Sequence, residues 1–148
     1  MYFVDREKIT KTLTYMEKIY AEFLEMERPS TVREQLALER MATVIIESII
    51  DVGNAMIDGF IMRDPGSYED IIDILEDETV VSPEHAEQLK RVVFLRKQLV
   101  QQFIDVDHQS VYDVLQSSQQ ALLQFPKDVR RYLEEELGPV AAFLPEKK

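Results

Sequence analysis

The sequence contains no cysteine, and this absence excludes disulfide bonds, thiolate-bound zinc and cysteine nucleophiles. A chain without cysteine fits a reducing compartment, and we expect a cytoplasmic protein. No apolar run reaches the length of a membrane span, and the N-terminal segment MYFVDREKITK lacks the order of residues that a signal peptide needs. We therefore expect no contact with membranes. The four glycines are too scattered to form a phosphate-binding loop.

Histidine is also scarce, because the chain has only His85 and His108. Each follows a predicted helix cap, where we expect it to lie at the surface in the first turn. Neither belongs to a His-x-x-x-His or Glu-x-x-His pattern, which would place two metal ligands on one helix face. The sequence therefore predicts no metal site and no other cofactor.

Positive charge is in the minority, since the net charge of the 148-residue chain is −11. Such a chain repels nucleic acid unless its basic residues gather on one face. The dense basic group is the segment LKRVVFLRK, which holds the candidate phosphate- and RNA-binding residues Lys90, Arg91, Arg96 and Lys97. The alternative interpretation is that these residues form a solvated helix face.

Helical periodicity runs through nearly the whole chain, and no strand-like alternation of useful length is present. We expect helices after the Asp5 cap, over about 32–62, 68–76 and 83–102, from the Asp107 cap to an interruption at Pro126, and finally over 128–137. This order predicts an all-α fold, an antiparallel four-helix up-down bundle with additional short helices. Residues 1–125 form the bundle, and 126–148 add a short C-terminal helix and tail within the same single domain. Buried positions are expected to include Leu36, Val100 and Phe103.

Three polar residues stand out in the most apolar helix. Glu47, Asp51 and Asn54 lie about one turn apart on a flank of the buried stripe. We interpret them as a structural seam supporting Arg96, whose guanidinium points into or beside an apolar stripe and needs a carboxylate partner, a cleft or another subunit. A functional site at these positions is the alternative.

The segment RKQLVQQF contains Arg96, Gln101 and Phe103 at a notable spacing. On an α-helix Arg96 and Gln101 are about 140° apart around the axis. They therefore converge only if the helix is distorted there or if two chains bring their copies together.

The chain resembles the HepT-like proteins of the HEPN superfamily over about residues 5–120. The resemblance rests on the order of DREKI, LERMATVIIESIIDVGNAMI, YEDIIDIL, LKRVVFLRKQLV and IDVDHQSVYDVL. It implies a helical bundle that forms a homodimer through the helices carrying its motif. It also implies a metal-independent ribonuclease toxin paired with a minimal nucleotidyltransferase antitoxin.

The motif of that family is Arg, four to six residues, His, one residue, Tyr. The histidine exchanges the proton of a 2′-hydroxyl near neutral pH, the arginine binds the phosphate, and the tyrosine can accept an adenylyl group from the antitoxin. Arg96 matches, but Gln101 replaces the histidine and Phe103 replaces the tyrosine. An amide does not titrate near neutrality, and a phenyl ring has no hydroxyl to modify.

Two hypotheses remain open from the sequence. The first is a HepT-like toxin-family protein whose degenerate catalytic motif, Arg96, Gln101 and Phe103, leaves RNA cleavage weak or lost. The second is a non-enzymatic helical dimer that binds a partner protein or a nucleotide through the same groove. Position 101 favours the second hypothesis for activity, and the resemblance favours the first for cellular context.

Overall fold

The computed structural model describes residues 3–138, and every regular element within that range is a helix. The predicted all-α class is therefore confirmed. In chain order the helices are α1 (Arg6–Glu25), α2 (Val32–Gly59), α3 (Tyr68–Asp77), α4 (Pro83–Phe94), the π-helical turn η1 (Lys97–Gln101), α5 (His108–Ser117) and α6 (Gln119–Leu137).

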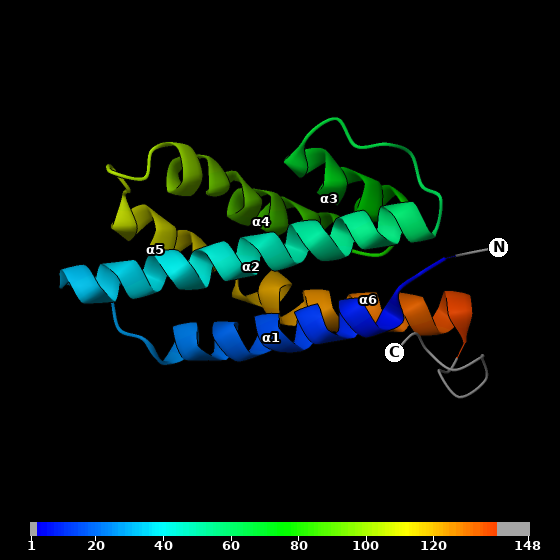
Figure 1. Ribbon diagram of the computed structural model, residues 1–148, viewed down its shortest axis with the longest axis horizontal. Helices are drawn as coiled ribbons and strands as arrows, with labels where there is room; N and C mark the ends of the chain where they lie inside the picture. Colours follow the sequence, from blue (N-terminus) through cyan, green and yellow to red (C-terminus); the bar gives the residue numbers. More distant parts are fainter. Residues whose placement is uncertain (1–2, 139–148) are drawn as a thin grey trace.

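Helix α2 runs along the long axis of the molecule and is its central element (Figure 1). Figure 1 shows α1 and α6 below α2, and α3, α4 and α5 above it. Helix α2 packs directly against α1, α3, α4 and α5. Its apolar surface is wide, and it buries residues against neighbours on two sides.

The starts of the helices are fixed by side chains that accept otherwise unpaired backbone N–H groups. Asp5 accepts from Lys8 at 3.0 Å, and Thr31 forms a complete capping box with Glu34. Ser82 caps α4, and Pro83 occupies its first position. Local sequence therefore sets these boundaries as predicted.

The apolar stripe of α1 is buried and supplies one wall of the core. Its buried members are Ile9, Leu13, Met16, Tyr20 and Phe23. Tyr20 is 2% exposed, and its hydroxyl donates a hydrogen bond of 2.7 Å to the carbonyl oxygen of Leu115. This bond ties α1 to α5 inside the core, and burial raises the pKa of the Tyr20 phenol.

Tyr20→Phe is expected to lower the free energy of unfolding at pH 8 by about 1–2 kcal/mol, because Leu115 loses its donor. The raised pKa means that the stabilisation is fully present below about pH 10, the unfolded value, and falls as pH rises toward the folded value. Urea denaturation of both proteins at pH 8 and pH 11 checks this. The difference between them should shrink at pH 11, and an equal difference at both pH values would contradict it.

Two glycines of α2 allow neighbouring segments to approach the helix closely. A Cβ atom at Gly53 would overlap the buried Ile71 side chain of α3. At Gly59 it would lie 2.6 Å from Cγ2 of Val4 and 3.1 Å from the carbonyl oxygen of Phe3. The absence of a side chain therefore lets α3 and the N-terminal segment approach α2.

The predicted helix break at Pro126 is wrong. Helix α6 runs through Pro126, and the chain instead changes direction at Ser118, between α5 and α6. A proline inside a helix costs about 3 kcal/mol. Burial of its neighbours on α6 against α1 and α4 offsets that cost; they are Leu122, Phe125, Val129 and Leu133.

The division between residues 125 and 126 falls inside α6. The prediction of a tail over the last residues concerns 139–148, which lie outside the described residues. The single-domain organisation of the whole chain therefore stays a prediction.

The expected burial of Leu36 is also wrong, because this side chain is 56% exposed. It lies in the first turns of α2, where Leu38, two residues on, is the fully buried side chain, so Leu36 is on the solvent-facing side of the helix. Over residues 3–138, none of the helices combines the length and apolarity that a membrane crossing requires.

Candidate functional site

Helix α4 ends at Phe94, eight residues before the predicted end at Gln102. The N–H of Leu95 bonds to the carbonyl groups of Val92 and Val93, and the wider turn η1 then follows over Lys97–Gln101. Such π-helical turns occur often at functional sites, because they re-aim side chains within a helical segment. The segment RKQLVQQF is therefore not a regular helix end.

The altered turn changes which apolar side chains face the core. Leu95 and Leu99 are buried, whereas Val100 is 46% and Phe103 is 65% exposed. The prediction that Val100 and Phe103 face inward is therefore wrong. It assumed α-helical spacing, and the end of α4 followed by the wider turn rotates the later residues away from the core.

Arg96 precedes η1 and reaches back to α2. Its Nε donates a hydrogen bond of 2.7 Å to Oε2 of Glu47, which confirms that a residue of the predicted seam contacts it. Its guanidinium also lies 4.6 Å from the centroid of the Tyr68 ring, a cation–π contact with the start of α3. The side chains of Arg96 and Glu47 are 28% and 41% exposed, so this pair is not the buried one expected.

Glu47 holds the Arg96 side chain in one orientation. The hydrogen bond that Arg96 donates to Glu47 raises the pKa of the guanidinium, and desolvation opposes this effect. Exposed pairs contribute on the order of 1 kcal/mol or less to stability. The pair is therefore a positioning device more than a stabilising one.

The two terminal amino groups of Arg96 have no hydrogen-bond partner among the described residues, although its Nε is engaged. A guanidinium presents its donors in a planar fork that matches the oxygens of a phosphate. Arg96 is thus a preoriented cation whose terminal amino groups are available to a ligand.

The other seam residues do not contact Arg96. Asp51 is exposed, and Asn54 lies beside a separate cavity next to Tyr68. Among the basic residues near the motif, Lys90 is bound to Asp73 at 3.0 Å and to Glu87 at 3.5 Å. The three seam residues therefore do not form one cluster, and the basic residues near the motif do not form one either.

Arg91 and Lys97 are exposed and form no salt bridge with a described residue. Gln101 lies at the end of η1 and is also exposed. In a π-helical turn residues five apart come closer to one face than the about 140° of an α-helix. The distortion that convergence of Arg96 and Gln101 requires is therefore present.

His108 was expected at the surface, but it is half-buried against α2. Its Nε2 lies 2.6 Å from Oε2 of Glu39, and the two side chains are 21% and 25% exposed. Glu39 and Glu47 are eight residues apart on α2, or about 12 Å along its axis. His108 therefore does not supply a proton carrier at Arg96 within one chain.

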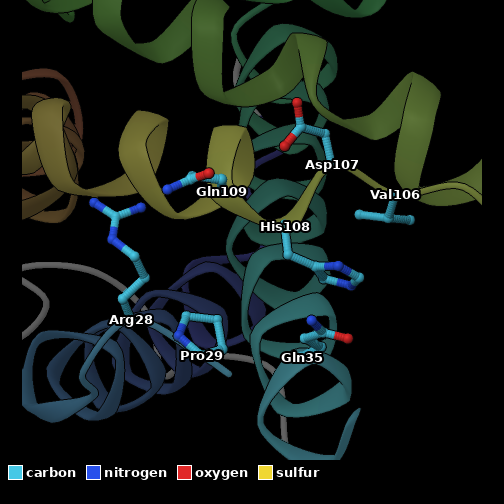
Figure 2. A pocket seen from close by; sticks show the side chains of 7 residues that line it. All are labelled: Arg28, Pro29, Gln35, Val106, Asp107, His108 and Gln109. Carbon is cyan, nitrogen blue, oxygen red and sulfur yellow. The ribbon is translucent and has the colours of Figure 1, made fainter. Parts of the chain in front are cut away.

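A cavity of about 310 Å³ lies beside His108, between the α1–α2 loop and the start of α5. Figure 2 shows Arg28 on one side of this cavity and His108 with Gln35 on the other. Arg28 is paired with Asp113 at 2.8 Å, and Asp107 caps α5. Because the charges around this cavity are paired, they join the loop, α2 and α5 structurally.

No local pattern indicated the pair of His108 and Glu39, which are 69 residues apart in the sequence. His85, also expected at the surface, is half-buried. Within residues 3–138 no three histidine, aspartate or glutamate side chains are grouped to hold a metal ion.

The chain matches the model of a protein family, "HepT-like: Ribonuclease HepT-like", over residues 4–129. It is 51% identical over 143 residues to "Putative RNase YutE" of Bacillus subtilis (strain 168), covering 97% of this chain and 99% of that protein.

Two solved structures are similar to the fold. "Structure of Cytosolic Protein of Unknown Function YutE from Bacillus subtilis" matches with a TM-score of 0.93 at 51% identity, over 97% of this chain and 100% of that one. "Crystal structure of the toxin-antitoxin with AMP-PNP" matches with a TM-score of 0.71 at 17% identity, over 82% of this chain and 96% of that one. The second likeness concerns the fold alone.

Proposed function

Since the chain belongs to the HepT-like ribonuclease family, we propose that it is a toxin-family protein that binds RNA through Arg96 and cleaves it weakly or not at all. The proposal includes a homodimer that pairs through the motif-bearing segment. It also includes a nucleotidyltransferase partner in a toxin–antitoxin pair and a cytoplasmic location, the latter because the similar YutE of Bacillus subtilis is a cytosolic protein.

The observation that carries RNA binding is the orientation of Arg96. Glu47 engages its Nε, Tyr68 supports its plane, and its two terminal amino groups have no described partner. A phosphate that bonds both amino groups forms two parallel charge-assisted hydrogen bonds. Arg91 and Lys97 add positive charge nearby in the sequence, against the net charge of −11.

Weak cleavage follows from the side chains around Arg96. Metal-independent cleavage of RNA needs a base that removes the proton of the 2′-hydroxyl near neutral pH. Gln101 occupies the motif position of the histidine and is exposed, but its amide does not titrate near neutral pH. His108, the histidine nearest to Gln101 in sequence, is held by Glu39, which lies eight residues before Glu47 on α2.

The partnership with a nucleotidyltransferase rests on the family and on the fold shared with a toxin–antitoxin structure that contains AMP-PNP. Phe103 is 65% exposed but offers no hydroxyl, so it cannot accept an adenylyl group as the family tyrosine does. Any partner of this chain must therefore act on it without modifying position 103.

The second candidate function, a non-enzymatic dimer that binds a protein or nucleotide, is favoured by a different observation. The stretch from Phe94 to Ile104 exposes four large apolar side chains, which are Phe94, Val100, Phe103 and Ile104. Such a concentration of exposed apolar side chains is typical of an interaction surface.

Arg96→Ala is expected to weaken binding of a short single-stranded RNA by at least about 10-fold, because hydrogen bonds to charged groups contribute roughly 1.5–3 kcal/mol. Fluorescence anisotropy at low salt, where phosphate contacts are strongest, measures this. Arg33→Ala is the matched control, because Arg33 is also exposed on the described structure but lies about 21 Å along α2 from Glu47. Equal losses in both variants would show nonspecific charge attraction and contradict the proposed site.

A further inference from the structure

A second cavity lies beside Tyr68, the residue whose ring contacts the Arg96 guanidinium. It has a volume of about 380 Å³, in the range of small-ligand pockets. Its lining combines an aromatic ring, an amide, a carboxylate and backbone of a tight loop: Asn54, Pro65, Gly66, Ser67, Tyr68, Glu69 and Ile71.

Tyr68 connects this cavity to the phosphate-binding arginine. Its ring is in contact with the Arg96 guanidinium, at 4.6 Å from the centroid, and it also lines the cavity. The side chain is 45% exposed, so ring surface is available to a ligand. A ligand that bonds Arg96 through one group therefore meets the Tyr68 cavity with its adjoining group.

The positions on α2 set the size of that ligand. Glu47, which holds Arg96, and Asn54, which lines the cavity, are seven residues apart and lie on one face of the helix. The separation along the axis is about 10 Å. A single nucleotide, with its phosphate at one end and its base at the other, spans such a distance.

The charge of the lining selects a base over a second phosphate. Glu69 contributes a carboxylate, and no basic residue lines the cavity. An anion is therefore disfavoured there, whereas an aromatic base with N–H donors on its edge is favoured. Asn54 adds an amide that both donates and accepts, the combination that reads base edges.

The rim of the cavity is built before any ligand arrives. Arg63 forms two hydrogen bonds of 2.8 and 2.9 Å with Asp70, whose Oδ2 also accepts from the N–H of Gly66 at 2.9 Å. These contacts hold the pKa of Asp70 at about 2, so the carboxylate keeps its charge and the loop its shape near neutral pH. Binding does not need to order this loop.

We propose that the Tyr68 cavity is a nucleobase subsite, in which an unpaired base of single-stranded RNA stacks against Tyr68 while its phosphate binds Arg96. This inference rests on the proposed RNA-binding function and names its substrate class. Single-stranded RNA is recognised in this way because its unstacked bases are free to pack on aromatic side chains.

The test compares nucleoside 5′-monophosphates with ribose 5-phosphate, which has the same phosphate and sugar but no base. NMR titration of the full chain should show at least one nucleotide binding about 10-fold or more tighter than ribose 5-phosphate. Tyr68→Ala should remove this advantage, so that the nucleotides and ribose 5-phosphate bind with equal affinity, whatever the loss of the contact with Arg96 does to both. Tyr68→Phe should retain the advantage. Tyr15→Ala, at an equally exposed tyrosine of α1, is the matched control.

The outcomes separate this subsite from the proposed function. If all ligands bind equally and depend on Arg96, the subsite is overturned and phosphate binding stands. If Tyr68→Ala weakens ribose 5-phosphate as much as the nucleotides, Tyr68 only positions Arg96, and the subsite is again overturned. If no ligand binds and Arg96→Ala changes nothing, both proposals fail.

Discussion

Gln101→His combined with Phe103→Tyr is expected to raise RNA cleavage by the purified protein by roughly one to a few powers of ten. Arg96 already presents two amino groups to a phosphate, and a titratable group near neutral pH is what the motif lacks. The new histidine supplies that group, and the tyrosine restores a hydroxyl beside it. Both positions are exposed, so neither substitution meets a packed core. Gel analysis of a labelled single-stranded RNA over time measures the gain.

The control for this result is the same double variant carrying Arg96→Ala, which should be inactive because the phosphate loses its cation. Placement limits the size of the gain, since a shift of about 1 Å can cost 100-fold. Efficient cleavage by the unmodified protein that His108→Ala abolishes would contradict the proposal. His108 would then be the proton carrier, with Glu39 orienting its ring.

The second large effect concerns assembly. Light scattering at high micromolar concentration is expected to give twice the chain mass, because a two-fold dimer buries the exposed apolar stretch around the motif. Phe94 and Ile104 are 62% and 90% exposed, and with Val100 and Phe103 they concentrate exposed apolar side chains in one segment, as is typical of an interaction surface. Replacing both with glutamate should raise the dimer dissociation constant by at least about 100-fold, as expected for central interface side chains.

Leu123→Glu is the matched control for the dimer, because Leu123 is a 46% exposed apolar residue of α6, on the other side of α2 (Figure 1). It should leave the dissociation constant unchanged. A monomeric parent protein, or equal weakening by Leu123→Glu, would show that the motif segment is not the interface.

Local sequence determined the framework of this protein for physical reasons that act over a few residues. Caps such as Asp5, Thr31 and Ser82 fix helix starts because backbone N–H groups need acceptors within one turn. The stripe of α1 and the two-sided apolar surface of α2 fix the core because helical periodicity places these residues together. The segments that carry the family resemblance were also recognisable from the local sequence.

Competition between neighbours decided what the sequence left open. Pro126 has a strong local preference to end a helix, but burial of the residues around it against two other helices outweighs that preference. Val100 and Phe103 fit an α-helical stripe, but α4 ends at Phe94 and gives Leu95 and Leu99 the buried positions. Local rules fail here because the free energy of packing is larger than the propensity of single residues.

The sequence determined part of the candidate site, and the tertiary structure determined the rest. The sequence alone identified Arg96 and its need for a partner from residue chemistry, and the family resemblance predicted the motif positions Gln101 and Phe103. Only the tertiary structure decided that Glu47 and not Asp51 holds Arg96, that Tyr68 lies under its guanidinium, and that His108 belongs to Glu39. Such contacts join residues 28 to 69 positions apart, and their formation depends on how α2 packs against α3, α4 and α5, which no local pattern encodes.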